Sequence, residues 1–351
     1  MLVRSEKEIY IIAEIGQNHN GDINIAKKII NQLDNFPYDK ISKNRFQKVN
    51  AIKLTKRDLT EELSRDGMDT PYTGINSFGT TYGIHREFLE LSYEQHVELG
   101  NYIKSKDFEF IETICSVKCL KLLDMVEVDK IKVASRDLTN IPLIEALSQR
   151  HEPVILSTGM ADEIDLNNAL DIFKRNGKTN ISILHCLSQY PAEYNKLNLN
   201  TIGYLKENYK DYTIGYSDHS LGTHIPVVSV ALGAEIIEKH VTLDTNMKGT
   251  DHKGSANIQT FTKMVHDIRS LEFSLGDYKL QCDPSVKPSK IKLERSLAFK
   301  NSKKSGDIIT VDDLHMISPG DGYKWCDRDK FIEKRVLVNV ESNTLLTKNM
   351  I

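Results

Sequence analysis

The stretch TIGYSDHSLGTHIPVVSVALGAEIIEKH, residues 213–240, contains two segments that read as buried β-strands, and each ends in a histidine, His219 or His240. The residues between the segments, 221–233, are numerous enough for one crossover helix. In a parallel sheet, a strand–helix–strand unit brings the carboxyl ends of both strands to the same edge. The sequence therefore predicts that the two imidazoles converge at one edge of a parallel sheet.

The rest of the chain repeats this alternation of strand and helix patterns. Apolar runs rich in β-branched residues occur at residues 9–15, 51–54, 108–113, 130–134, 153–157, 181–186, 213–216 and 235–240. Helical patterns separate most of these runs, at residues 23–33, 93–106, 142–148, 161–176 and 198–208. Pro142 suits a first helical turn, and Asn198 is expected to be an N-cap. Strands that alternate with helices favour a parallel sheet covered on both faces.

Eight such strand–helix units predict a (β/α)8 barrel, the TIM-barrel fold. The structural alternative is an open, doubly wound sheet. That fold would need a glycine-rich G-x-G-x-x-G turn after the first strand, and residues 14–21 read EIGQNHNG instead.

The chain is longer than one ordinary domain, and its length suits a barrel with a small appendage. We expect a barrel domain over residues 1–276, a polar linker containing prolines over 277–290, and a compact β-rich module over 291–351. A module of this size is near the lower limit for folding alone. We therefore expect it to dock against another surface.

Composition excludes several function classes. The 351 residues carry a formal net charge of −3, which gives no basic footprint for nucleic acid. No apolar stretch of the roughly 18 residues needed to cross a membrane occurs, and residues 1–6 show no signal sequence. Five cysteines without a C-x-x-C spacing are typical of a reducing compartment. We expect a cytoplasmic protein that binds neither nucleic acid nor membranes.

The histidine pair is the first candidate for chemistry. A single histidine at a strand end is more often a structural hydrogen-bonding residue than a ligand. Here two of them are expected at one edge, and Asp251 follows His240 by eleven residues. The pair with an acid close behind favours a divalent metal site at the barrel mouth.

Several motifs, in one order along the chain, resemble those of the sialic acid synthase family. They are AEIGQNHNG at 13–21, KVASRDLTNIP at 132–142, LSTGM at 156–160, GYSDH at 215–219 and EKHVT at 238–242. The C-terminal module resembles the antifreeze-like (SAF, β-clip) domain of these synthases. The resemblance implies condensation of phosphoenolpyruvate with an N-acetylated amino sugar of the N-acetylmannosamine type, or its 6-phosphate.

The resemblance also implies a metal and its role. Residues matching His219 and His240 hold Mn²⁺ or Mg²⁺ in the family, and such an ion polarises the oxygen of the sugar aldehyde. Hard cations prefer oxygen ligands, so water and substrate oxygens would complete the shell.

The resemblance to the family also implies which residues contact the substrates. Lys53 and Lys132 are expected to oppose the anionic groups of phosphoenolpyruvate, although a strand-end lysine can also be a solvated rim residue. The hydroxyls expected at the phosphate are those of Thr113, Ser135, Ser157, Ser188 and Ser217.

The sugar is expected to meet Glu14, Tyr190 and Asp251, and Asp137 is expected to assist a proton transfer. The plainer interpretation of Glu14 is a salt bridge to a lysine, because burying an unpaired carboxylate is costly.

One departure from the family pattern concerns assembly. In the family, the second domain covers the barrel mouth of the partner in a domain-swapped homodimer and inserts an arginine there. Ser318 stands at the nearest position of this chain, so we expect Lys324 or Arg328 to take over that contact.

Two alternatives stay open at this point. The same chemistry could produce legionaminic or pseudaminic acid instead of N-acetylneuraminic acid or its 9-phosphate. A catalytically silent sugar-binding protein is the non-enzymatic alternative.

Overall fold

The computed structural model describes residues 8–35 and 48–351, and the chain divides into two compact units. The first unit ends at Asp277 and the second is Tyr278–Ile351. This division lies one residue beyond the barrel end expected from the sequence. The segment expected as a linker, 277–290, already contains the start of a short helix, α11 (Lys287–Leu293).

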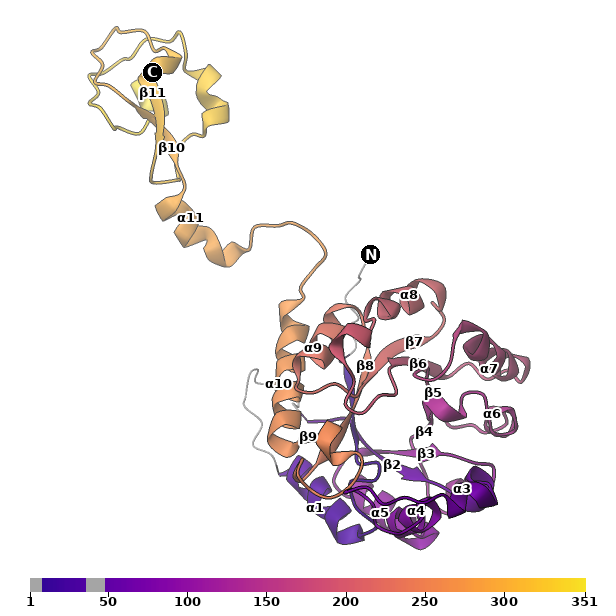
Figure 1. Ribbon diagram of the computed structural model, residues 1–351. Coiled ribbons are helices and arrows are strands. Elements are labelled where there is room, and N and C mark those ends of the chain that lie inside the picture. The colour runs from indigo at the N-terminus through magenta and orange to yellow at the C-terminus, as the bar shows by residue number, and fades with distance from the viewer. Residues whose placement is uncertain (1–7, 36–47) are drawn as a thin grey trace. The chain divides into compact units, whose positions relative to one another are not determined.

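The first unit is a closed barrel of eight parallel strands, which confirms the (β/α)8 prediction (Figure 1). Neighbouring strands pair in chain order, and β8 pairs back onto β1, so that Glu14 lies beside His240. The strands are β1 (Tyr10–Glu14), β2 (Ala51–Lys56), β3 (Glu109–Ile114), β4 (Lys130–Val133), β5 (Val154–Ser157), β6 (Ile181–Cys186), β7 (Thr213–Asp218) and β8 (Ile236–Thr242). A two-residue strand, β9 (Ala256–Asn257), pairs in parallel with the end of β8.

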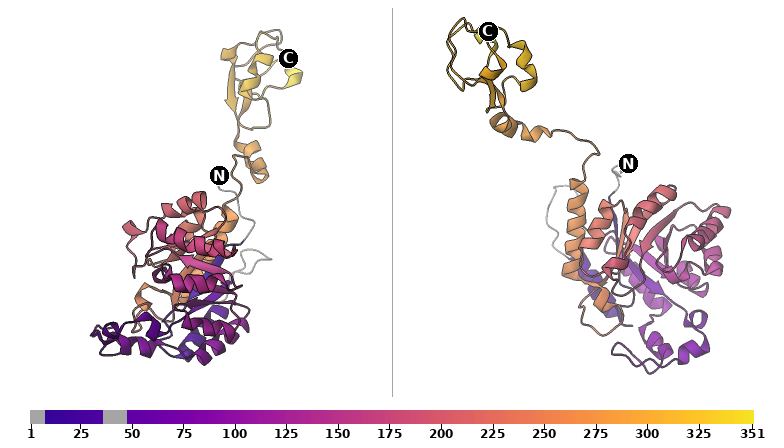
Figure 2. Two further views of the ribbon diagram at one scale, coloured as in Figure 1. Left: turned by 90° about the vertical axis from the view of Figure 1, so that its right-hand side faces the viewer. Right: turned by 45° about the horizontal axis from the view of Figure 1, so that its top comes forward.

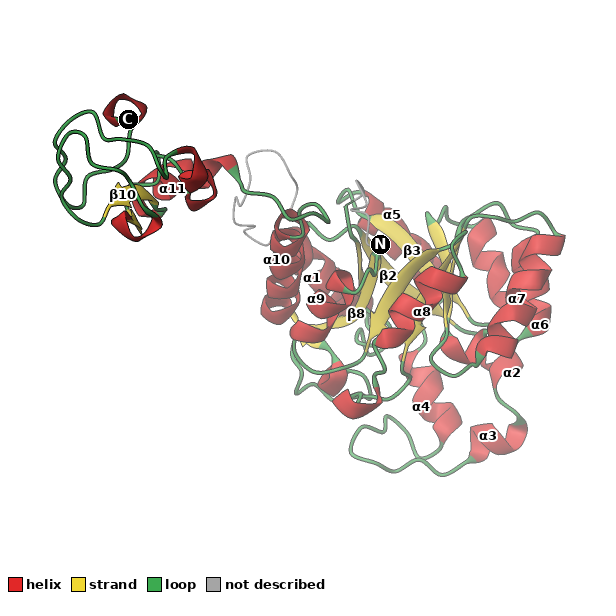
Figure 3. Ribbon diagram, turned by 90° about the horizontal axis from the view of Figure 1, so that it is seen from above, coloured by secondary structure: helices red, strands yellow, loops and turns green. Residues whose placement is uncertain are grey.

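Helices surround the strands, as the view in Figure 3 shows with yellow strands inside red helices. They are α1 (Ile23–Asp34), α5 (Tyr93–Lys104), α6 (Ile141–Ser148), α7 (Glu163–Arg175), α8 (Asn200–Asn208), α9 (His224–Ala231) and α10 (Ile258–Ser274). Pro142 lies in the first turn of α6, as predicted. The prediction that Asn198 caps α8 is wrong. Its φ of 45° is left-handed, whereas an N-cap residue is normally extended, and the helix begins two residues later.

Two connections differ from a simple strand–helix repeat. Between β3 and β4 the chain forms a 3₁₀ helix, Lys118–Asp124. The connection between β2 and α5 is long and carries three short helices that the sequence patterns did not predict. They are α2 (Leu59–Glu62), α3 (Arg65–Asp69) and α4 (Tyr82–Leu89). Each begins after a residue whose side chain accepts a backbone hydrogen bond, namely Asp58, Ser64 and Thr81.

The barrel interior has an apolar layer below a polar one. Side chains alternate along a strand, so every second residue points inward. Near the amino ends of the strands, a buried apolar cluster consists of Ile12, Ala51, Ile111, Ile155, Leu184 and Ile236. Two residues further along the same strands come Glu14, Lys53, Thr113, Ser157, Cys186 and Glu238. The apolar layer closes one end of the barrel, and the polar layer therefore faces the other end.

The second unit has a small core of its own. β10 (Ser296–Phe299) and β11 (Leu314–Ile317) form an antiparallel pair, and loops surround it (Figure 2). Elsewhere in the unit, Ile308 and Arg335 join through an isolated antiparallel bridge and not through longer strands. The buried core side chains are Leu297, Phe299, Ile309, Leu314, Phe331, Val336, Val340 and Leu346.

Within residues 8–35 and 48–351, every helix is too short or too polar to cross a lipid bilayer.

Candidate active site

A cavity of about 260 Å³ opens at the carboxyl ends of the barrel strands. All the predicted site residues except Asp137 line it. They are Glu14, Lys53, Thr113, Lys132, Ser135, Ser157, Ser188, Tyr190, Ser217, His219, His240 and Asp251. The parallel register explains this, because strand ends of the same direction meet at one edge.

The floor of the cavity contains a buried set of opposite charges, which we call the lysine floor: Glu14, Lys53, Lys132 and Glu238. Lys53 forms an ion pair with Glu14, and its Nζ lies 3.6 Å from Oε1 of Glu238. Lys53 also donates a hydrogen bond of 2.9 Å to Oγ1 of Thr113. The salt-bridge interpretation of Glu14 is therefore confirmed, and Glu14 also lines the cavity.

Burial and neighbouring charges shift the pKa values of the two floor acids, Glu14 and Glu238, in opposite directions. Burial raises the pKa of Glu14 from 4.5 to about 7, against the pull of Lys53 and with the help of Glu238. Burial also works to raise the pKa of Glu238, but Lys132 and Lys53 outweigh it and lower the pKa to about 2. At neutral pH Glu238 is therefore ionised, whereas Glu14 is close to half-protonated.

Lys132 is the less neutralised of the two lysines. Its Nζ donates to the carbonyl oxygen of Val133 at 3.0 Å. In the described part of the chain, the structure gives Lys132 no ion pair, whereas Lys53 has two. Burial lowers the pKa of Lys132, although Glu238 opposes that shift. Lys132 is thus a buried cation with spare capacity for an anionic ligand.

Hydroxyl groups gather beside Lys132. Oγ of Ser135 accepts a 2.9 Å hydrogen bond from the backbone N–H of Gly159, while the buried Oγ of Ser157 has no hydrogen-bond partner among residues 8–35 and 48–351. A Cβ at Gly159 would lie 2.5 Å from Oγ of Ser188 and 2.9 Å from Oγ of Ser135. Only glycine therefore fits between these hydroxyls, which leaves them free to surround a small oxyanion.

The predicted histidine pair, His219 and His240, converges at the carboxyl ends of β7 and β8 and lines the same cavity. The ring centres of His219 and His240 are 5.5 Å apart, and the ring of Tyr190 lies 4.0 Å from that of His219. Nδ1 of His219 lies 2.8 Å from the carbonyl oxygen of Leu187, so this nitrogen donates and Nε2 carries the lone pair. Gly16 makes room beside His240, because a Cβ there would lie 3.0 Å from Cε1 of His240.

The donor set suits a divalent cation in part. In the described part of the chain, Nδ1 of His240 is buried without a hydrogen-bond partner, and burial lowers the pKa of this imidazole to about 3, which keeps it neutral. Burial works to lower the pKa of His219 as well, but Cys186 and the carbonyl oxygen of Leu187 outweigh it and raise the pKa. His240 therefore has a lone pair available for a metal, and His219 offers one in its neutral form. Within the described ranges, no group of three or more His, Cys, Asp or Glu side chains is arranged so that it could hold a metal ion by itself. Any further ligands would therefore be oxygen atoms from substrate or water.

The remaining acids are placed differently. Asp251 lies in the loop after β8, where Oγ1 of Thr250 donates to its carboxylate at 2.9 Å, and it faces the cavity. Asp137 instead accepts a 3.3 Å hydrogen bond from Nε of Arg136 and is not among the cavity-lining residues. The geometry gives its expected proton-transfer role no direct support.

Sequence reasoning missed part of the lining. The residues to which it gave no role are Gly16, Gln17, Thr55, Arg57, Arg86, Cys115, Ala134, Arg136, Met160, Cys186, Glu238 and Thr250. Glu238 could have been found, because it lies two residues before His240 and so on the same face of β8. Arg57 and Arg136 also carried a signal, since each follows a floor lysine by four residues. Arg86 lies on α4, and its sequence position gives no indication of the cavity.

Comparison with known proteins identifies the family. Residues 41–279 match the model of the NeuB family. The chain belongs to the NeuB family. It is 31% identical to the N-acetylneuraminate-9-phosphate synthase of Homo sapiens, over 99% of this chain and 94% of the human protein. It is 32% identical to the N,N'-diacetyllegionaminic acid synthase of Campylobacter jejuni, over 97% of this chain and 99% of that protein.

A solved structure agrees with this assignment. The N-acetylneuraminic acid synthetase of Leptospira borgpetersenii, crystallised with citrate, is 32% identical with a TM-score of 0.68. The match covers 82% of this chain and 92% of that one. As a NeuB family member, the protein is an enzyme of the sialic acid synthase type, a transferase that performs a condensation and makes nonulosonic acids.

Proposed function

We propose that the protein condenses phosphoenolpyruvate with N-acetylmannosamine, or with its 6-phosphate, in a metal-dependent reaction. The products are N-acetylneuraminic acid, or its 9-phosphate, and inorganic phosphate. The single observation that carries the proposal is the shared cavity, which the histidine pair and the lysine floor both line at the barrel mouth.

The reaction balances with water as the third reactant. A carbon–carbon bond forms between C3 of phosphoenolpyruvate and the aldehyde carbon of the sugar. Water adds at C2, and the bond from C2 to the phosphate oxygen breaks, directly or after an intermediate, so that phosphate leaves. The aldehyde oxygen gains a proton and becomes a hydroxyl group.

The floor residues bind and orient phosphoenolpyruvate. Lys132 has the spare charge for an anionic group, and Ser135, Ser157 and Ser188 surround the space beside it. Charge-assisted hydrogen bonds to a phosphate are about twice as strong as neutral ones. Lys53 and Thr113 add two further donors, and Ser217 completes the set of hydroxyls around the floor.

The part of the cavity lined by His219 and His240 receives the sugar. His219 and His240 would hold Mn²⁺ or Mg²⁺, which when bound makes the aldehyde carbon more electrophilic. Tyr190 packs against His219 and Asp251 stands above His240 in the same cavity, so both can orient the sugar hydroxyls. Glu14, with a pKa of about 7, is placed to accept or return a proton near neutral pH.

Phosphate release tests the proposal. Purified protein is mixed with phosphoenolpyruvate, Mn²⁺ and one candidate sugar at a time, including the acceptors for legionaminic and pseudaminic acid. We expect phosphate release with an N-acetylmannosamine-type sugar, and none with the sugar omitted. Release with only a different acceptor would move the assignment to that product, and release with no acceptor at all would contradict the proposal.

Metal removal is the second arm of that test. A chelator should abolish turnover, and added Mn²⁺ should restore it. His219→Ala and His240→Ala should each lower kcat by at least about a hundredfold, because metal polarisation is worth several kcal/mol. His151→Ala is the matched control, since this histidine is 89% exposed and lies outside the cavity. Full activity in metal-free buffer would contradict the proposal that turnover depends on a metal ion.

We also propose that the protein works in the cytoplasm as a domain-swapped homodimer, in which residues 278–351 cover the barrel mouth of the partner. The five cysteines are free thiols, which fits a reducing compartment. Both candidates for the missing arginine are engaged inside their own unit, Lys324 by Glu294 and two carbonyl oxygens, and Arg328 by Asp329 and the carbonyl oxygen of Trp325. We propose Arg328, because its guanidinium group has more donors to offer a further ligand. A cover of this kind would exclude water from the reacting groups.

Light scattering tests the assembly, with an expected mass of twice 40.0 kDa. A complementation experiment then tests whether the site is shared. Mixing His219→Ala subunits with subunits that end at Asp277 should restore activity that neither has alone. A monomer, or a dimer without rescue, would contradict the swapped arrangement.

A further inference from the structure

Three arginines form a second cationic group in the cavity, which we call the arginine rim: Arg57, Arg86 and Arg136. All three line the cavity, together with Gln17 and Cys115. Arg57 follows β2, Arg86 lies on α4 and Arg136 follows β4. The reaction described above uses none of them.

The rim lies above the floor on the same strands. Arg57 follows Lys53 by four residues, and Arg136 follows Lys132 by four residues. Arg57 comes directly after β2, and Arg136 lies in a 3₁₀ helix, Ser135–Asp137, that follows β4. Both arginines therefore begin beyond the carboxyl ends of their strands and nearer the barrel mouth than the lysines, on the β2–β4 side, whereas His219 and His240 come from β7 and β8.

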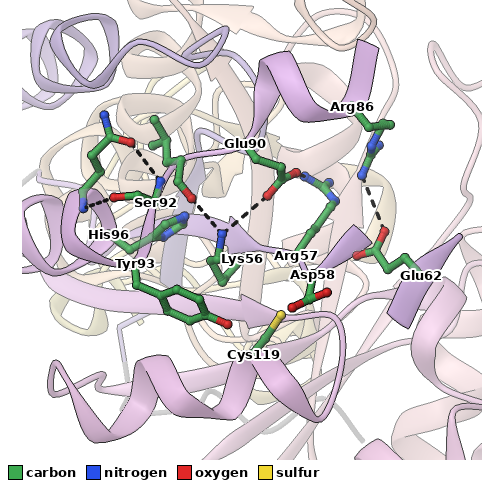
Figure 4. A network of polar contacts seen from close by, with 12 residues as sticks. Lys56, Arg57, Asp58, Glu62, Arg86, Glu90, Ser92, Tyr93, His96 and Cys119 are labelled. Atoms are coloured by element: carbon green, nitrogen blue, oxygen red, sulfur yellow. Dashed lines mark hydrogen bonds and ion pairs between the residues drawn. The ribbon is translucent and has the colours of Figure 1, made fainter. Parts of the chain in front are cut away.

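The acids that pair with the arginines stand behind them. Nη1 of Arg57 lies 3.5 Å from Glu90, and Nη2 of Arg86 lies 3.7 Å from Glu62, as Figure 4 shows. Arg136 donates to Glu62 at 2.9 Å. Neither Glu62 nor Glu90 lines the cavity. The rim is thus held in place from the outside and offers its positive charge to the inside.

The guanidinium groups keep unused donors. With the amide of Gln17 oriented by its neighbours, its oxygen accepts 2.9 Å hydrogen bonds from both Arg57 and Arg86. Two like charges therefore share one neutral acceptor. Among the residues that the structure describes, Nε of Arg57 and Nε of Arg86 are buried and have no hydrogen-bond partner. Burial and the neighbouring Arg57 both lower the pKa of Arg86. An anion in the cavity would place a negative charge beside two guanidinium groups that share one neutral acceptor.

We propose that Arg57, Arg86 and Arg136 form an anion subsite that binds a phosphate group carried by the acceptor sugar. This rests on the proposed function, and it selects the phosphorylated acceptor over the neutral one. A sugar whose aldehyde faces His219 and His240 can extend its far end across the mouth to the β2–β4 side. The acids that pair with the three guanidinium groups do not line the cavity, so a neutral sugar would leave the cavity side of these groups without a countercharge. The other source of the same chemistry is the phosphate or carboxylate of phosphoenolpyruvate, and the experiment separates the two.

The test compares two acceptors, N-acetylmannosamine and its 6-phosphate, in the wild type and in Arg57→Gln, Arg86→Gln and Arg136→Gln. We expect the wild type to prefer the phosphorylated sugar. Each variant should reduce the ratio of the two kcat/KM values by about ten- to hundredfold, because a charge-assisted hydrogen bond is lost. Arg175→Gln is the matched control, since this exposed arginine ends α7 and does not line the cavity.

A binding measurement keeps the inference independent of turnover. Calorimetric titration of the 6-phosphate into metal-free protein should show a dissociation constant that rises by a similar factor in each Gln variant. If a Gln variant does not fold by circular dichroism, the corresponding Lys variant retains the charge and should lose less affinity.

The outcomes are distinct. A wild type that prefers the neutral sugar, or variants that leave the ratio and the affinity unchanged, would overturn the subsite. Variants that raise the KM of phosphoenolpyruvate equally with both acceptors would overturn it in favour of a role at that substrate. If no acceptor supports turnover but the 6-phosphate still binds through the arginines, the proposed function fails and the subsite stands.

Discussion

The lysine floor and the arginine rim are two cationic layers of one cavity, and they place their countercharges on opposite sides. At the floor, Glu14 and Glu238 line the same cavity as the lysines they neutralise. At the rim, Glu62 and Glu90 lie outside the lining and leave the arginines facing inward. Asp137, which pairs with Arg136, also lies outside the lining, so the acids of the two layers have different consequences for a ligand.

The comparison teaches where charge is available. A ligand that enters the floor meets carboxylates as well as ammonium groups, so its binding depends on Lys132 and on the protonation of Glu14. A ligand that reaches the rim meets guanidinium groups whose far sides are already held. Removing a charge should accordingly disturb stability most at the floor, where the ion pairs are internal.

The largest expected effect is on stability, in Lys53→Met. Removing this ammonium leaves Glu14 and Glu238 buried beside each other without their shared partner. Breaking a buried ion pair in this way costs about 3–5 kcal/mol. Chemical denaturation followed by circular dichroism measures it. A variant as stable as the wild type would remove the distinction between floor and rim.

The next effect is on affinity, in Lys132→Met. This lysine has no ion pair in the described chain, but its charge helps to keep the buried Glu238 ionised, so its loss should cost some stability, though less than the loss of Lys53. It should weaken phosphoenolpyruvate binding by about ten- to hundredfold. Calorimetry measures the affinity, with the exposed Lys174→Met as control. Strong destabilisation with unchanged affinity would show that Lys132 is structural after all.

The smallest effect concerns pH and Glu14. Its pKa rises from 4.5 in the unfolded chain to about 7 in the folded protein, so the folded state binds the proton more tightly. The stability that Glu14 contributes is complete below pH 4.5 and is lost as the pH rises through about 7. Relative to Glu14→Gln, the wild type should lose roughly 1–2 kcal/mol between pH 5 and pH 8, because coupling to Glu238 spreads the titration. Parallel stability profiles for the two proteins would contradict the raised pKa.

Much of the barrel could be predicted because its information is local. Apolar runs and helical periods located all eight barrel strands, since each period reports which side of an element is buried. The three short helices between β2 and α5 were not predicted, because a helix of one or two turns is too short to show a helical period of apolar residues. The cap predicted at Asn198 failed because the residue type alone does not determine the backbone angle.

The candidate site divides in the same way. The sequence by itself determined which strands end in histidine, lysine or serine, and the parallel barrel then requires those ends to share one edge. Only the tertiary structure decided which charges meet. It paired Lys53 with Glu14 and Glu238, turned Asp137 toward Arg136 and brought Arg86 from α4 into the cavity lining. The physical reason is that strand ends follow from repeating local patterns, whereas ion pairs depend on side chains that are distant in sequence and close only after the barrel closes.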